Sequence, residues 1–317
     1  MPETARPPLR WMFESGERRR QALQYWIVHT LVGPLNMSIH YSLRMLPIDA
    51  CSAVGAALGA FAQIRLPVKD AHAREVWRRT RPDADKAAVD AAMRRLWRNV
   101  GRTMAEFSVL DRMWDAGRIE VVGRENLDRA SATGRPMIGL GLHLGNWETL
   151  GLAMLRIGFQ GGSIYVPPDN RFDQIIAAKA RRRIAPEGAI LARPNAAAEA
   201  YIMLTKKKQQ IVMYADELSR GRVWGPAFGR ALRTNGNIGN AIRLARLSNA
   251  LIVPIYSERL GDQARFRVSA LPPVDLVDTG DRDADLMTNI AKVDAVIDPI
   301  IRSHLDQWFF ALDFEFD

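Results

Sequence analysis

Residues 137–148 read MIGLGLHLGNWE, and this stretch determines the fold that we expect. Its first six residues form a short apolar run, bounded by an Arg-Pro pair before it and by His143 after it, which is typical of a buried strand. Gly145 then supplies a turn, and Asn146 is a favoured cap for a helix that begins one residue later. The stretch therefore predicts a strand, a turn and a helix, with a histidine at the end of the strand.

The same alternation of apolar strands and helices continues toward the C-terminus. It predicts an α/β fold with a mixed, mostly parallel central sheet flanked by helices. Residues 265–270 are expected to form an antiparallel edge strand, and the last helix is expected to break or bend at Pro299. The other expected strands are residues 119–122, 137–142, 163–166, 189–191, 210–214 and 251–256. The expected helices are residues 147–157, 177–183, 196–206, 238–247 and 284–304.

The chain before residue 115 has helical rather than alternating patterns. Residues 87–113 read as one long amphipathic helix. Residues 25–45 and 48–64 read as two weakly apolar helices that follow three successive arginines. Polar residues and a proline interrupt residues 25–45, so we expect this helix to lie on a membrane surface, with a marginal transmembrane helix and an ordinary packed hairpin as alternatives. We divide the chain into a basic membrane-associating segment, 1–66, and an α/β domain with leading amphipathic helices, 67–317.

Composition restricts the class of partner. The chain has 317 residues, of which 48% are hydrophobic, and its net charge of +9 favours an anionic partner such as nucleic acid, anionic lipid or an acidic carrier protein. The basic residues are spread through the chain, and RNP, zinc and helix-turn-helix signatures are absent, which argues against nucleic acid. A single cysteine, Cys51, gives no intrachain disulfide, so we expect the catalytic parts to face the cytoplasm.

His143 is the candidate catalytic histidine. Of the five histidines, only His143 is followed five positions later by a carboxylate, that of Glu148. On one regular helix the two side chains would point about 140° apart, but a strand-turn-helix lets Glu148 in the first turn reach back to the imidazole. Glu148 would then accept a hydrogen bond from one ring nitrogen, and the other nitrogen would deprotonate a hydroxyl that attacks an activated acyl carbonyl. A core histidine with a structural hydrogen bond is the alternative.

Several motifs resemble, in order, those of the bacterial lipid A biosynthesis acyltransferases, the late lauroyl and myristoyl transferases. This family shares a His-x4-Asp/Glu signature with the glycerolipid acyltransferases. The matching runs are GLHLGNWE at 141–148, IYVPPDN at 164–170, VMYAD at 212–216, WGPAFGR at 224–230, VPIYSER at 253–259 and DQWFF at 306–310. The chain departs from the family at Val166 and Glu217, and at residues 311–313, where Ala-Leu-Asp replaces His-Arg-Arg.

The resemblance implies a glycerolipid-acyltransferase-like fold at the cytoplasmic face of the inner membrane. The donor would be acyl carrier protein or acyl-CoA, the acceptor a hydroxyl of a lipid A precursor, and no metal or cofactor is implied. His143 and Glu148 would be catalytic, and one of three successive arginines would meet a phosphate or the acyl carbonyl. The implied substrate-binding residues are Asn146, Arg181, Arg182, Arg183, Asp216, Phe228, Thr234 and Arg259.

Two other functions fit the same residues. The acceptor would be a different lipid, such as a lysophospholipid, a glycolipid or an aminolipid, if the altered C-terminal motif reflects a different specificity. A basic peripheral protein that binds anionic lipid without catalysis is favoured by the net charge of +9 and by the missing C-terminal arginines. The intact pair of His143 and Glu148 argues against this second possibility.

Overall fold

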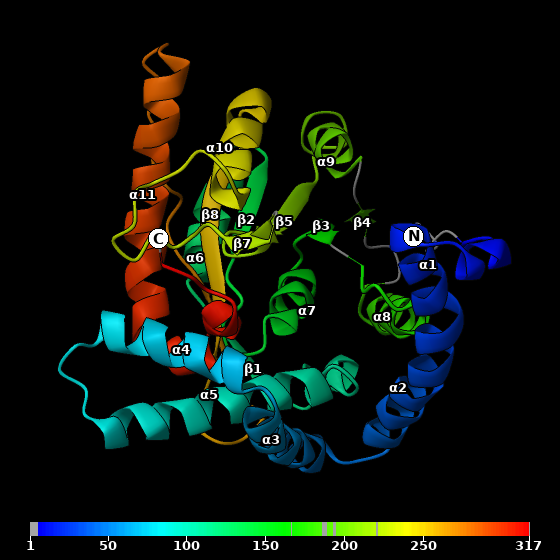
Figure 1. Cartoon of the computed structure of the whole chain (residues 1–317). Coiled ribbons are helices and arrows are strands. Elements are labelled where there is room, and N and C mark those ends of the chain that lie inside the picture. The colour runs from blue at the N-terminus through cyan, green and yellow to red at the C-terminus, as the bar shows by residue number, and fades with distance from the viewer. Residues whose placement is uncertain (1–5, 166, 186–188, 193–194, 220, 317) are drawn as a thin grey trace.

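The computed structural model describes residues 6–165, 167–185, 189–192, 195–219 and 221–316. Seven strands form one sheet in the order β1-β9-β8-β2-β5-β3-β4 (Figure 1). Among these strands, β8 and β9 pair antiparallel and every other neighbouring pair is parallel. The strands are β1 (Ile119–Val122), β2 (Met137–Gly141), β3 (Gly161–Tyr165), β4 (Ala189–Ala192), β5 (Gln210–Tyr214), β8 (Leu251–Arg259) and β9 (Phe266–Ala270), and a separate hairpin joins β6 (Leu218–Ser219) to β7 (Arg222–Val223).

Helices cover both faces of the sheet. The apolar side chains of α9, α10 and α11 pack on one face, and those of α6 and α7 pack on the other. The helices are α1 (Gly16–Leu23), α2 (His29–Arg44), α3 (Ile48–Arg65), α4 (Pro67–Thr80), α5 (Lys86–Glu106), α6 (Arg124–Ala132), α7 (Glu148–Arg156), α8 (Arg171–Ile184), α9 (Ala196–Thr205), α10 (Asn237–Ser248) and α11 (Arg282–Ser303). Short 3-10 turns cover Leu9–Phe13, Leu110–Arg112, Leu305–Gln307 and Phe309–Leu312, and a π-helical turn covers Gln24–Val28.

The predicted mixed, mostly parallel sheet is confirmed, and three details differ. Strand β9 is antiparallel to β8 as expected, but it is not an edge strand because β1 pairs with its other side in parallel. Helix α5 ends at Glu106, and the chain then turns rather than continuing to residue 113. Helix α11 continues through Pro299, where the fully buried Ile297 and Ile301 on either side hold it against the core.

Alternation along β2 explains the sequence that precedes His143. Ile138 and Leu140 are fully buried and pack with residues of α10 and α11. Gly139 and Gly141 face the opposite side, where a Cβ atom on Gly141 would lie 2.9 Å from Cε1 of Tyr214. The absence of a side chain at position 141 therefore leaves room for the Tyr214 ring immediately beside the end of the strand.

The N-terminal helices pack on the body through glycines. Helices α3 and α5 lie against each other so closely that a Cβ on Gly101 would be 2.2 Å from the Gly55 carbonyl oxygen and 2.6 Å from the Gly59 nitrogen. Helix α2 packs on α8, and a Cβ on Gly33 would overlap the ring of Phe172. The first contact brings α3 close to the turn that follows β2, because Ser52 of α3 and Asn146 of that turn both bond Glu106.

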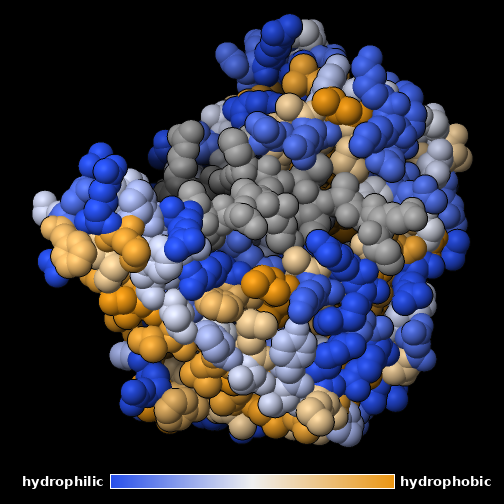
Figure 2. Space-filling model, turned by 90° about the vertical axis from the view of Figure 1, so that its right-hand side faces the viewer, coloured by the Kyte–Doolittle hydropathy of each residue, from blue (hydrophilic) through white to orange (hydrophobic). Residues whose placement is uncertain are grey.

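Apolar side chains are also exposed along α2 and α3. The exposed fractions are 71% for Leu31, 60% for Leu35, 60% for Phe61 and 78% for Ile64. Figure 2 shows apolar side chains gathered along the lower part of this face of the molecule. In the part of the chain that the structure describes, no single helix has the length and hydropathy to cross a bilayer; α3 and α4 together reach both, but they meet at a bend of 96°.

We expect Gly101→Ala to lower the free energy of unfolding by about 1–3 kcal/mol, because the added methyl group must displace backbone of α3. The matched control is Gly151→Ala in α7, where a Cβ would meet nothing within 4 Å. The control should raise stability by about 0.5–1 kcal/mol, since glycine disfavours a helix interior. Urea denaturation of both variants checks this, and equal stability would contradict the close packing of α3 on α5.

Candidate active site

His143 lies two residues beyond β2 and is held by Asp216, which lies two residues beyond β5. The imidazole Nδ1 is 2.9 Å from Oδ1 of Asp216, and the backbone N–H of His143 donates to Oδ2 at 2.9 Å. The indole Nε1–H of Trp308 donates to the same Oδ2 at 2.8 Å. Asp216 is fully buried, so its carboxylate fixes the orientation of the imidazole from inside the protein.

The register of the two strands explains this pairing. Strands β2 and β5 are parallel neighbours, and Gly141 lies opposite Tyr214. Two further residues along each chain lead to His143 and Asp216, which therefore emerge side by side. Parallel strands of α/β proteins commonly bring functional side chains together at their carboxyl ends in this way.

Aromatic rings surround the imidazole of His143. Its ring centroid is 4.2 Å from that of Tyr214, 4.8 Å from that of Phe310 and 5.2 Å from that of Trp147. Burial raises the pKa of Tyr214 well above its ordinary value of 10.0, and the Glu148 carboxylate raises it further. Tyr214 therefore stays a neutral phenol that donates to the Trp147 carbonyl at 3.1 Å, and it does not compete with His143 as a base.

The prediction that Glu148 bonds the His143 ring is wrong. Glu148 is the first residue of α7, and its Oε1 accepts a hydrogen bond from Nη2 of Arg181 at 3.1 Å. Among the described residues, the partner of Nδ1 is Asp216, and Nε2 of His143 bonds nothing. The sequence spacing places Glu148 in the correct turn, but its side chain extends toward α8 instead of the histidine.

The three successive arginines have different surroundings. Arg181 faces the site, with its guanidinium carbon 3.7 Å from the Tyr165 ring centroid. Arg182 is exposed, and Nε of Arg183 lies 3.4 Å from an Asp111 oxygen. Burial lowers the pKa of Arg181, but the Glu148 carboxylate and Tyr165 outweigh this effect and raise it overall, so the cation persists. Its Nη1 is buried and, within the described part of the chain, has no hydrogen-bond partner.

Two predicted substrate-binding residues, Asn146 and Arg259, lie beneath the site rather than at its surface. Asn146 is fully buried and donates to the carboxylate of Glu106 at 2.9 Å. Arg259, with 1% of its side chain exposed, donates to both oxygens of Glu106 at 2.7 and 2.8 Å. These polar groups are already engaged inside the protein.

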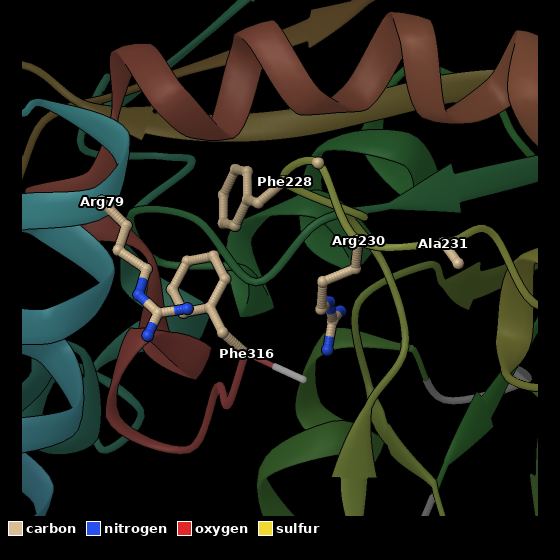
Figure 3. A pocket seen from close by; sticks show the side chains of 6 residues that line it. Arg79, Phe228, Arg230, Ala231 and Phe316 are labelled. Carbon is tan, nitrogen blue, oxygen red and sulfur yellow. The ribbon is translucent and has the colours of Figure 1, made fainter.

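Phe228 and Thr234 lie on the loop between β7 and α10. Phe228 packs edge-on against Trp308, with 5.4 Å between ring centroids, and so reaches Asp216 through one intervening side chain. It also lines a pocket of about 490 Å³ whose other lining residues do not include His143 (Figure 3). The carbonyl of Thr234 accepts a hydrogen bond from Arg243 at 3.2 Å, and its side chain bonds no described residue around His143. Contact of either residue with substrate stays a prediction.

Neither Cys51 nor a metal-binding cluster offers a second catalytic centre among the described residues. Burial raises the pKa of the Cys51 thiol to about 11, and the thiol donates to the Ala105 carbonyl at 3.3 Å, so it is not a thiolate near neutral pH. The described residues contain no group of three or more His, Cys, Asp or Glu side chains that fits a metal ion.

Sequence reasoning missed several residues of the site. Trp308, Tyr214 and Phe310 belong to the matching motifs but carry no predicted role, and Glu106 belongs to no motif. One signal for the pairing is present in the sequence: His143 and Asp216 each lie two residues beyond an apolar strand. The contacts of Trp308 and Glu106 have no such signal, because they come from segments far away along the chain.

A comparison with known families identifies the family of the chain. The family model described as bacterial lipid A biosynthesis acyltransferase matches residues 14–313, nearly the whole chain, and the protein therefore belongs to that family. Membership implies an acyltransferase that uses an acyl donor and a lipid acceptor. A search of curated proteins found no match.

Proposed function

We propose that the protein transfers a fatty acyl group from acyl carrier protein or acyl-CoA to a hydroxyl of a lipid A precursor, with His143 as the general base. The observation that carries this proposal is the pairing of His143 with Asp216. Oδ1 of Asp216 accepts a hydrogen bond from Nδ1–H of His143, with 2.9 Å between the two heavy atoms, which leaves Nε2 as the ring atom with a free lone pair. Family membership supplies the class of reaction.

The reaction needs no covalent intermediate on the enzyme. Nε2 of His143 takes the proton of the acceptor hydroxyl while the hydroxyl oxygen attacks the thioester carbonyl. The tetrahedral intermediate then collapses, the carbon–sulfur bond breaks, and the imidazolium returns its proton to the leaving thiolate. The aromatic rings of Tyr214, Trp147 and Phe310 shield this exchange from water.

Arg181 is suited to receive negative charge during this reaction. Glu148 anchors one end of its guanidinium at 3.1 Å, and the buried Nη1 remains without a partner among the described residues. A buried cation with an unused donor stabilises an oxyanion or a phosphate more strongly than an exposed one, because water screens it less. In this role Glu148 orients Arg181 rather than His143.

The exposed apolar side chains of α2 and α3 support contact with the inner membrane from the cytoplasmic side. The three arginines at positions 18–20 are exposed on the preceding helix α1 and would face anionic headgroups. Apolar side chains such as Leu31 and Ile64 would enter the headgroup region. The site would thereby reach a lipid acceptor that remains in the bilayer.

We expect His143→Ala and Asp216→Asn each to lower kcat by about 10²–10⁴-fold, because the first removes the base and the second its tautomer-fixing partner. Glu148→Gln should lose about 10–100-fold through Arg181. The control is His304→Ala, which removes another histidine–carboxylate pair, 2.9 Å from Glu258, and should leave kcat within about threefold. Steady-state transfer by folded protein tests this, and an unchanged rate in His143→Ala would sink the mechanism.

Deletion of the gene should produce a lipid A species lighter by one acyl chain, restored by the wild-type gene but not by His143→Ala. Mass spectrometry of extracted lipid A and phospholipids from the same cells measures this. If lipid A is unchanged and a different acylated lipid is missing, the reaction is still acyl transfer, and the acceptor is a lysophospholipid, glycolipid or aminolipid. No change in any lipid would favour the non-catalytic lipid-binding alternative.

A further inference from the structure

A buried carboxylate, Glu106, lies beneath the turn between β2 and α7. It is the last residue of α5 and is fully buried. Arg259 donates to both of its oxygens at 2.7 and 2.8 Å, Ser52 donates to Oε1 at 2.6 Å, and Asn146 donates to Oε2 at 2.9 Å. The carboxylate of Glu106 thus connects four segments through hydrogen bonds: α3, α5, the turn between β2 and α7, and β8.

The charge of Glu106 determines which way the Asn146 amide points. An ionised carboxylate only accepts hydrogen bonds, so Asn146 must turn its NH2 group toward Glu106. The amide oxygen then faces the opposite direction and accepts the backbone N–H of Glu148 at 3.2 Å. Asn146 lies one position before Trp147, the N-cap residue of α7, and its amide oxygen thereby takes up the N–H of the first residue of the helix. This hydrogen bond sets where the Glu148 side chain meets Arg181.

The same network holds the backbone of Gly145 from both sides. Thr103, one turn before Glu106, donates to the Gly145 carbonyl at 2.7 Å. The N–H of Gly145 donates to the Gln307 carbonyl at 3.2 Å, and the Gln307 side chain bonds the backbone of Arg259 at 2.7 and 3.2 Å. Gly145 has a φ of +56°, and a Cβ there would lie 2.7 Å from the Ser257 carbonyl oxygen. The backbone of the turn after His143 is therefore held in one conformation.

Stability alone is a weak reason for a carboxylate at this place. Buried ion pairs lose most of their attraction to desolvation, and well-packed apolar residues often replace them without loss. A second guanidinium, that of Arg102, donates to the Ser52 hydroxyl at 2.9 Å, so the network holds two buried cations around Glu106. An apolar residue in place of Glu106 would not determine the orientation of the Asn146 amide.

We propose that Glu106 is a positioning residue for the acyl transfer: through Asn146 it fixes the first turn of α7 and hence the pairing of Glu148 with Arg181. This inference rests on the proposed function, because it concerns the geometry of that same site. Glu106 is fully buried and touches no substrate, so its effect is on the rate of the chemical step.

Two substitutions of Asn146 separate the role of its hydrogen bond to Glu106 from that of its hydrogen bond to the Glu148 N–H. Asn146→Asp retains an oxygen that accepts the Glu148 N–H, but it places a second carboxylate against Glu106. Asn146→Ala removes both hydrogen bonds. We expect both to lower kcat by about 10–100-fold with the KM for lauroyl-CoA within about threefold, because misplacement of catalytic groups affects the transition state more than binding.

The matched control is Ser52→Ala, which removes a different donor to Glu106 and leaves Asn146 in place. It should lower the melting temperature about as much as Asn146→Ala does, while kcat stays within about threefold of wild type. Wild-type kcat in Asn146→Asp would overturn the proposal, because the hydrogen bond to the Glu148 N–H alone would then suffice. A raised KM with unchanged kcat would overturn it in favour of substrate binding by Asn146.

A double-mutant cycle tests the route through Asn146. Glu106→Gln allows the position-146 amide to turn around, so its kcat loss should match that of Asn146→Ala, and the double variant should lose no more than either single variant. Additive losses would contradict the route. If Glu106→Gln does not fold, the two Asn146 variants decide the question.

His143→Ala, assayed beside these variants with lauroyl-CoA or lauroyl-acyl carrier protein and a lipid A precursor, separates failure of the inference from failure of the proposed function. Wild-type turnover in His143→Ala, or no transfer by the wild type, would reject the proposed function and the positioning role with it. An inactive His143→Ala beside fully active Asn146 variants would reject the positioning role alone.

Discussion

The site depends on the three N–H groups that converge on the Asp216 carboxylate. Two come from His143, one from its ring and one from its backbone, and the third comes from Trp308. These bonds tie the end of β2 to the end of β5 and to the C-terminal segment. Because Asp216 and Trp308 are both fully buried, each bond forms away from competing water, and the orientation of the imidazole follows from the fold.

Glycines occupy the two positions near this carboxylate where a side chain would not fit. Gly141 leaves room for Tyr214, whose ring lies against His143, and Gly145 allows the chain to turn without striking Ser257. The C-terminal segment completes the enclosure, since the backbone N–H of Phe309 donates to the His143 carbonyl at 3.0 Å. Residues far apart along the chain thus determine the geometry around His143.

The sequence predicted the seven strands of the main sheet, most of the helices and the placement of His143, because these follow from local patterns such as an apolar run and a glycine turn; α6 was not predicted. It predicted the wrong partner for the ring, because nearness along the chain was taken as nearness in space. Parallel pairing of β2 with β5 brings Asp216 beside His143 across 73 residues, whereas Glu148, five positions away, extends toward α8. Glu106, which comes from a helix that precedes the sheet, was not predictable from any local pattern.

The central claim is that Asp216, and not Glu148, accepts the hydrogen bond from Nδ1–H of His143, so that Nε2 is the base. Nitrogen-15 NMR of the histidine side chains at neutral pH, assigned with His143→Ala, measures the tautomer directly. The account predicts a neutral His143 protonated at Nδ1, a signature that Glu148→Gln preserves and Asp216→Asn abolishes. Protonation at Nε2 in the wild type, or loss of the signature in Glu148→Gln but not in Asp216→Asn, would contradict it.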